Sequence, residues 1–211
     1  MAAEQNNLWT KCMDGKLEEV RLALQAGADP NTRGGSDNWT CLMVAIWKNY
    51  EELVDLLLAQ PGIEVNAEDQ NKDTALYYTC YIGNVAILSK LLDVPGLQMN
   101  KKNVRGRTPI MRAIRSGQTE AVRLMAAVEE VDLDLRDGEE HTLEDIAHIA
   151  HNRRLVISVV LFNAGVDRDK ETFQDNLQHE QRKGAGGPAD EIVAVLGEAR
   201  EKRERKRWEV F

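Results

Sequence analysis

The residue types that catalyse reactions or bind metals occur in this sequence, but their spacing does not form a known site. His148 and His151 stand three residues apart, which could place two metal ligands on one helix face, but no matching set of cysteines or carboxylates accompanies them. Acidic pairs such as Glu51–Glu52 are typical of solvated helix faces. The chain also lacks a phosphate-binding glycine loop and the His-Glu-x-x-His and Gly-x-Ser-x-Gly motifs. We therefore expect no catalytic residue, no metal site and no cofactor, and a protein that is not an enzyme.

Arginines gather in one part of an otherwise acidic chain, whose net charge is −8 at pH 7. This arginine cluster consists of Arg105, Arg107, Arg112 and Arg115. Because arginine binds carboxylates through two parallel hydrogen bonds, the cluster favours an acidic partner. Pairing with the acidic residues Glu139 and Glu140 of the same chain is the alternative.

A second basic segment, KRERKRW at 202–208, resembles a nuclear-import or nucleic-acid-binding patch. Its interspersed glutamates favour the solvated end of a helix instead. The sequence pI near 5.1 also argues against nucleic-acid binding, which we keep as an alternative function.

The cysteines and the apolar runs bear on location. Cys12, Cys41 and Cys80 lack the paired spacing of metal sites, and we interpret them as buried thiols in a reducing compartment. No apolar run is long enough to span a membrane, and the N-terminal residues do not resemble a secretory signal. We expect an intracellular protein of the cytoplasm, or also of the nucleus, without membrane contact.

Short helices must position these residues. In the segment 106–125, Thr108 can cap a helix that starts at Pro109, and Gly117 can end it with a positive φ. Thr119 then starts a second helix. Neither helix is long enough to be stable alone, so this helix hairpin must stack on other elements.

The same pattern recurs along the chain with a period of 34 residues. Thr40, Thr74, Thr108 and Thr142 are 34 apart, and so are Gly15, Asn49, Gly83 and Gly117. A fixed period of this length predicts a solenoid of stacked repeats.

The repeat resembles that of the ankyrin-repeat family, on the basis of GRTPIMRAI at 106–114, LLLAQPGIEVN at 56–66 and LQAGADPN at 24–31. The resemblance implies an all-α solenoid of helix-turn-helix repeats joined by β-turn or hairpin connections. One departure is that the histidine of the family's Thr-Pro-Leu-His motif is absent from every repeat. Another is that the fifth unit, 141–167, has an extra residue before its break.

The resemblance also sets the expected domains. An ankyrin-repeat domain covers 5–169, and it consists of an N-terminal cap at 5–36 and repeats at about 37–70, 71–104, 105–138 and 139–169. A polar linker at 170–187 and a C-terminal helix at 188–208 follow. The helix carries a narrow apolar stripe, formed by Ile192, Val195, Leu196 and Ala199. We expect this stripe to cap the open end of the solenoid, and a docking helix for a partner is the alternative.

In ankyrin repeats, the turn tips and the inner faces of the first helices form a concave groove. The corresponding positions here are rich in Trp, Tyr and Arg, which are enriched at binding hot spots. The candidate partner-binding residues are Trp39, Trp47, Tyr78, Tyr81, Arg105, Arg107, Arg112, Arg115 and His141. The aromatic residues could instead fill gaps between neighbouring repeats.

The sequence thus predicts a non-catalytic protein-interaction module that binds a partner polypeptide of acidic character in this groove. Two alternatives remain: nucleic-acid binding through the basic segments, or a scaffold whose docking element is the C-terminal helix.

Overall fold

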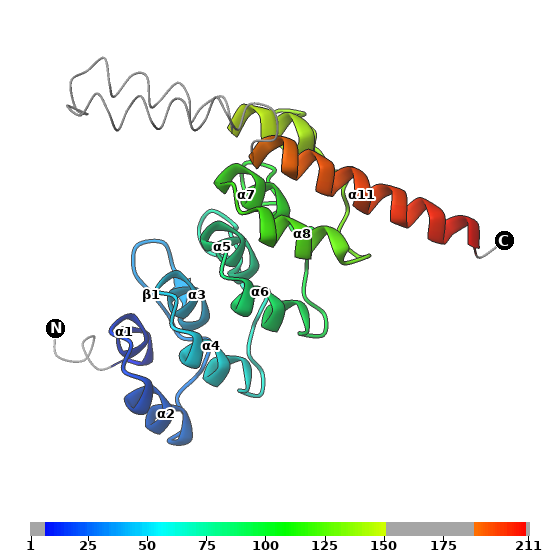
Figure 1. Ribbon diagram of the computed structural model, residues 1–211. Coiled ribbons are helices and arrows are strands. Elements are labelled where there is room, and N and C mark those ends of the chain that lie inside the picture. The colour runs from blue at the N-terminus through cyan, green and yellow to red at the C-terminus, as the bar shows by residue number, and fades with distance from the viewer. Residues whose placement is uncertain (1–6, 151–187, 210–211) are drawn as a thin grey trace, which may run out of the picture. The chain divides into compact units, whose positions relative to one another are not determined.

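The computed structural model describes residues 7–150 and 188–209. Within them, short antiparallel helix hairpins follow one another (Figure 1), and the chain divides into unit 1, which ends at Pro109, and unit 2, which starts at Ile110. Parts of the expected fifth repeat and the whole expected linker at 170–187 lie outside the described residues. The helices of unit 1 are α1 (Leu8–Met13), α2 (Leu17–Gln25), α3 (Cys41–Trp47), α4 (Glu51–Leu58), α5 (Ala75–Ile82) and α6 (Val85–Leu92).

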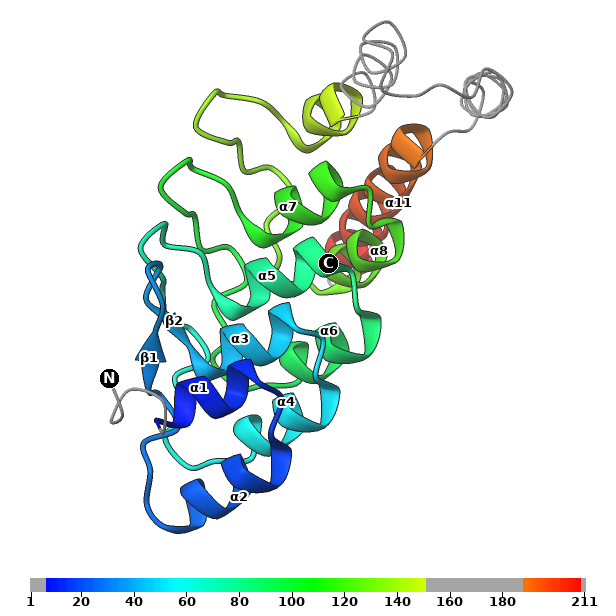
Figure 2. The same cartoon turned by 90° about the vertical axis from the view of Figure 1, so that its left-hand side faces the viewer.

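Unit 1 is a stack of three such hairpins. The first helices α1, α3 and α5 contact one another in turn, and the second helices α2, α4 and α6 form a parallel row, as Figure 2 shows. The first helices are the more deeply buried: every residue of α3 from Cys41 to Ile46 is buried. Since each hairpin touches only its neighbours, stability is distributed along the stack rather than centred in one core.

Threonine caps start these helices where the sequence predicts. The Thr40 hydroxyl accepts a hydrogen bond of 3.2 Å from Met43 N, and the Thr74 hydroxyl accepts one of 3.3 Å from Tyr77 N. Both bonds satisfy a backbone N–H that the first turn leaves unpaired. The predicted breaks are also confirmed, because Gly15, Asn49, Gly83 and Gly117 all have φ between 60° and 79°.

Asn31 and Asn66, at two successive repeat ends, each join a repeat to the next. Asn31 donates from Nδ2 to Gly62 O and accepts from Glu64 N, both at 2.9 Å. Asn66 makes the same pair of bonds one repeat later, to Gly96 O and Gln98 N, both at 2.8 Å. The side-chain amide thus bridges two backbone groups of the following turn.

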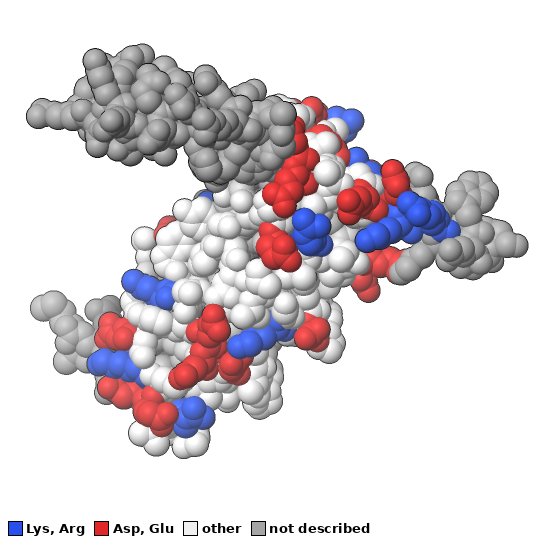
Figure 3. Space-filling model, viewed as in Figure 1, with Lys and Arg blue, Asp and Glu red and all other residues white. Residues whose placement is uncertain are grey.

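The outer face of unit 1 carries charges of both signs, which Figure 3 shows interspersed. Some of them pair across neighbouring repeats: Lys90 of α6 lies 2.7 Å from Asp55 of α4. Such exposed pairs contribute little stability individually.

Unit 2 contains most of α7 (Pro109–Ser116), then α8 (Thr119–Ala127), a helix starting at Leu143 that is described to 150, and α11 (Pro188–Glu209). Ile110, Ala113 and Ile114 of α7 are fully buried. The expected C-terminal helix is thus α11, and it packs along α8 (Figure 1).

Candidate partner-binding site

Four aromatic side chains of unit 1 form one cluster, hereafter the aromatic cluster: Trp39, Trp47, Tyr78 and Tyr81. Trp39 is in the short strand β2 (Trp39–Thr40), Trp47 ends α3, and both tyrosines are on α5. The Trp47 ring stacks on the Tyr81 ring at a centroid distance of 5.4 Å and an interplanar angle of 11°. Trp39 lies 5.4 Å from Trp47 and 4.8 Å from Tyr78. The sequence placed these four residues in the groove positions, and the structure brings them into mutual contact.

The Asp69 carboxylate accepts hydrogen bonds from two members of this cluster. Its Oδ2 accepts a hydrogen bond of 2.6 Å from the Tyr78 hydroxyl and one of 3.2 Å from Trp39 Nε1. Its Oδ1 accepts from the backbone N–H groups of Asn71 and Asp73, both at 2.8 Å. Asp69 is buried, so these four donors replace the water that the carboxylate loses.

Sequence reasoning missed Asp69, although a signal was present. Asn103 and Asp137 follow it with the same period of 34, and each accepts hydrogen bonds from two backbone N–H groups of its own loop. This side chain braces the turn at each of these loops, which fits the absence of the family's histidine. Among the described hydrogen bonds of these three side chains, those of Asp69 include donors from Trp39 and Tyr78, and those of Asp137 include the His141 ring.

The exposure of the cluster is uneven. The Trp47 side chain is 41% exposed, and Trp39 and Tyr81 are half-buried. Tyr78 was expected on the surface but is only 8% exposed, because its hydroxyl is turned inward to Asp69. Burial, and then the hydrogen bond to Asp69, raises the pKa of Tyr78 well above its ordinary value. Tyr78 therefore supports the cluster, while Trp47 presents it to solvent.

A hairpin from the N-terminal side carries Trp39. The strand β1 (Arg33–Gly34) pairs antiparallel with β2, so that Gly34 lies opposite Trp39. A Cβ at Gly34 would come within 2.4 Å of the Trp9 ring of α1, so only glycine lets this ring approach the strand. The position of Trp39 in the cluster is thus supported by the β1–β2 hairpin, which packs on Trp9 of α1, as well as by Asp69.

The arginine cluster is divided between a loop and a helix. Arg105 is exposed at a loop tip of unit 1. Arg107 was also expected at the tip, but it is only 9% exposed, and its backbone N–H donates to Asn103 Oδ1 at 3.0 Å. The C-terminal end of this loop is therefore buried at Arg107. This residue is poorly placed to contact a partner. Arg112 and Arg115 are half-buried on α7.

His141 is committed to its own loop. Its backbone N–H donates to Asp137 Oδ1 at 3.0 Å, and its ring Nδ1 lies 3.3 Å from the same oxygen. Burial alone would raise the pKa of Asp137, but the backbone N–H groups of His141 and Glu139 outweigh it and hold the pKa below its ordinary value. The backbone N–H of His141 thus donates to the side chain that braces its loop, as the backbone N–H groups of Asp73 and Arg107 do in theirs.

Exposed cations accompany the aromatic cluster in unit 1. Lys48 directly follows Trp47, while Lys72 and Arg105 lie at successive loop tips, and all three are exposed. The thiols of Cys12, Cys41 and Cys80 are free and buried, as the sequence predicts. Contact with the Cys12 thiol, followed by burial, raises the pKa of Cys41, so this thiol stays protonated and inert.

Repeated helix hairpins, threonine caps and left-handed breaks define a repeat protein of the helical solenoid class. The sequence profile described as ankyrin repeats (3 copies) matches residues 3–69 and 62–137. The chain belongs to the ankyrin-repeat family, and its fold is the all-α ankyrin-repeat solenoid.

Similar proteins carry such repeats within longer chains. Human transient receptor potential cation channel subfamily A member 1 is 32% identical over 64% of this chain and 11% of its own length. The human photoreceptor ankyrin repeat protein is 32% identical over 41% of this chain and 20% of its own. The probable 26S proteasome regulatory subunit p28 of Saccharomyces cerevisiae is 24% identical over 64% of this chain and 60% of its own. This chain therefore spans less than two thirds of the length of each.

Ankyrin repeats are generally protein-protein interaction modules, and typical members of the family are not enzymes. Among residues 7–150 and 188–209, no helix combines the length and the apolar character needed to cross a bilayer.

Proposed function

We propose that this chain is a non-catalytic interaction module that binds a segment of a partner polypeptide over the aromatic cluster of unit 1. The observation that carries the proposal is the exposure of Trp47 on a cluster whose other members are half-buried or buried. An exposed tryptophan surrounded by better-buried aromatic rings is the usual composition of a binding hot spot.

The cluster is prepared for binding before a partner arrives. The polar atoms of Trp39 and Tyr78 are both occupied by Asp69, so the two rings cannot rotate without losing a buried hydrogen bond. A surface that is already ordered loses little conformational entropy when it binds. The rings present an apolar, π-electron surface to a partner, and the loop tips present positive charges at Lys72 and Arg105.

We propose an acidic partner segment because exposed cations directly follow Trp47 and occupy two successive loop tips of unit 1, where Asp37 is the exposed acid nearest to Trp39 in the sequence. Lys48, Lys72 and Arg105 are exposed in unit 1, and Arg112 and Arg115 of α7 remain candidates for the same role. Arginine would contact a carboxylate through its paired N–H groups. We also propose an intracellular location, in the cytoplasm or also the nucleus, because three free thiols suit a reducing compartment.

Site-specific photo-crosslinking tests this function. A photoreactive phenylalanine analogue replaces Trp47 in one chain and Leu22 in another, because Leu22 is the described large apolar residue with the greatest exposure and lies on α2. We expect a crosslinked partner from cell extract at position 47 and none at position 22. Identical crosslinked bands at both positions would show that the cluster has no special role.

Charge reversal tests the acidic character of the partner. Arg105→Glu should weaken crosslinking at position 47, whereas Arg21→Glu on α2, which removes only an exposed pair with Glu18, should not. Trp47→Ala should weaken binding of the partner identified by crosslinking, measured with the purified partner, while the melting temperature stays nearly constant. An equal loss of stability would mean that Trp47 is a packing residue.

A further inference from the structure

The outer face of α8 is covered by α11. Ile192, Val195 and Leu196, three members of the apolar stripe, are buried, and α8 and α11 pack along each other. In unit 1, the second helices of successive repeats also contact each other, but less extensively. Among the described helices, α11 is therefore the main one that covers this face of α8.

A single arginine fixes the register of α11. Arg200 donates from Nη1 to Glu144 at 2.5 Å and from Nη2 to Leu133 O at 2.8 Å, and it lies 3.4 Å from Asp134. Directly before the stripe in the sequence, Glu191 lies 3.5 Å from Arg123 of α8. These charges lie on both sides of the apolar contact, so they define which helix face and which direction the α8 surface accepts.

Asp134 is the repeat-end residue that corresponds to Asn66, which it follows by two periods of 34. Among the described residues, Asp134 lies next to Arg200 of α11, and the carbonyl of Leu133 accepts a hydrogen bond from the same side chain. The loop at 133–134 is therefore part of the surface that α11 contacts.

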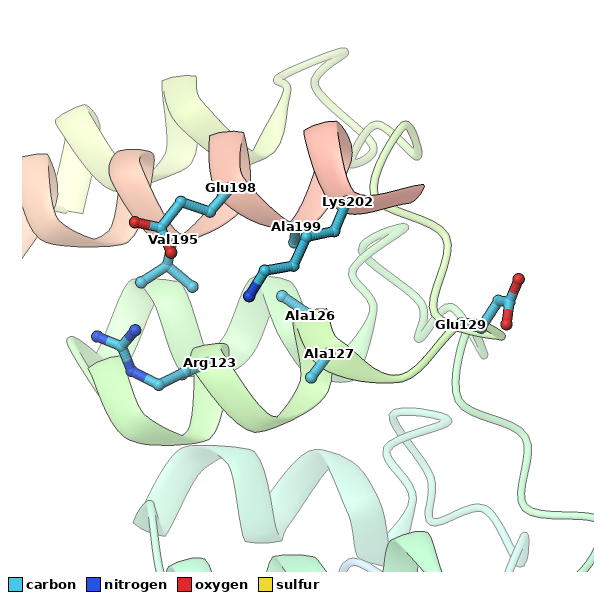
Figure 4. Close-up of a pocket in the computed structure, with 8 residues that line it drawn as sticks. All are labelled: Arg123, Ala126, Ala127, Glu129, Val195, Glu198, Ala199 and Lys202. Atoms are coloured by element: carbon cyan, nitrogen blue, oxygen red, sulfur yellow. The ribbon is translucent and has the colours of Figure 1, made fainter. Parts of the chain in front are cut away.

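The interface is not completely filled. A groove of about 270 Å³ remains between α8 and α11, and Figure 4 shows Ala126, Ala127 and Ala199 among the residues that line it. Small side chains from both helices leave this space, so a larger residue at position 199 would gain contacts. In the sequence, residues 151–187 lie between α11 and the described part of the helix that starts at Leu143.

We propose that α8 and the 133–134 loop form a second binding surface, for an amphipathic helix, which α11 occupies as an internal ligand. The partner helix carries apolar residues with the spacing of Ile192, Val195, Leu196 and Ala199, a larger residue in the last position, and an arginine directly after it. Such a helix displaces α11 because it fills the groove that Ala199 leaves open.

Labelled synthetic peptides test this proposal on the whole chain of residues 1–211. The probes are a peptide of residues 188–209, its Ala199→Leu version, and an Ala199→Leu version that also carries Arg200→Glu. Fluorescence anisotropy measures their binding to three chains: wild type, Arg200→Glu and Arg205→Glu. Arg205 is the matched control because its described ion pair is with Glu201 of α11 itself.

The Ala199→Leu peptide should bind wild type about ten-fold more tightly than the unmodified peptide. The Arg200→Glu chain should bind both peptides about ten-fold more tightly than wild type, since its own α11 competes less well. The Arg205→Glu chain should match wild type, and the peptide with Arg200→Glu should bind weakly everywhere.

Three results would overturn the proposal. The first is that no peptide binds any chain at about 100 μM, a weak affinity for a specific helix. The second is equal binding of all three peptides, which would show a nonspecific apolar contact. The third is loss of the helical circular dichroism signal of the whole Arg200→Glu chain, because α11 would then be an integral part of the fold rather than a replaceable ligand.

Discussion

The hydroxyl of Tyr78 lies 2.6 Å from the carboxylate of Asp69, and this bond ties the first helix of one repeat to the turn that precedes it. Asp69→Ala would leave up to four donors without their acceptor, among them Trp39 Nε1 and two backbone N–H groups. We expect a loss of about 3 kcal/mol in unfolding free energy, measured by urea titration with tryptophan fluorescence. Asp37→Ala, on an exposed residue, is the control, and equal effects of the two changes would refute the bracing role of Asp69.

The asparagine at the repeat end gives a second prediction. Asn66→Ala removes both bonds to the next turn, to Gly96 O and Gln98 N, and should cost about 2 kcal/mol. Asn66→Asp keeps the acceptor but loses the donor, so its cost should be intermediate. Gln98→Ala should be neutral, because only the backbone N–H of Gln98 takes part. If Asn66→Ala were as mild as Gln98→Ala, this bridge would contribute nothing to repeat stacking.

The depressed pKa of Asp137 predicts a pH dependence of stability. In the folded protein this carboxyl stays ionised at pH values where the unfolded chain already binds a proton. Its contribution is therefore complete above the unfolded pKa, about 3.9, and is lost as the pH falls through the lower folded pKa. Asp137→Asn should flatten the decrease in stability below about pH 4, as hydrogen exchange of residues 131–147 would report.

The same substitution should change stability at pH 7 by less than about 1 kcal/mol, because Asn103 already makes the equivalent backbone bonds in its own loop. Glu140→Gln, at the exposed tip of the loop of Asp137, is the control and should leave the pH profile unchanged. A profile of Asp137→Asn that follows wild type would contradict the assignment.

Gly197 lies inside the continuous helix α11, and no packing contact requires a glycine there. A Cβ at Gly197 would meet no atom within 4 Å, and the residue is exposed. Gly197→Ala should therefore stabilise the helix by about 0.5–1 kcal/mol and slow hydrogen exchange in α11. By contrast, Gly34→Ala should destabilise unit 1, because the new Cβ would clash with the Trp9 ring. Faster exchange in the Gly197→Ala chain would indicate that α11 needs a bend there.

Much of the fold could be predicted because it depends on local chemistry. Thr40 and Thr74 cap helices, and Gly83 and Gly117 take left-handed conformations, for reasons that a single residue and its neighbours contain. A strict period then extends each local inference to the next repeat.

The candidate site was less predictable because position in a repeat gives the direction of a side chain and not its depth. Tyr78 and Arg107 occupy surface positions of the pattern, but the side chain that braces each turn draws them inward. The stripe of α11 could be read from its spacing, whereas its partner surface on α8 could not, because a helix pattern does not specify what covers it.

The bonds of Asn31 and Asn66 have a consequence for how such a chain can change over generations. Both asparagines bind the backbone of the following turn and none of its side chains. The link between two modules is therefore indifferent to the sequence of the receiving module. A gene segment for one repeat can be duplicated, lost or recombined without a matching second mutation at this junction, while the exposed tips diverge toward new partners.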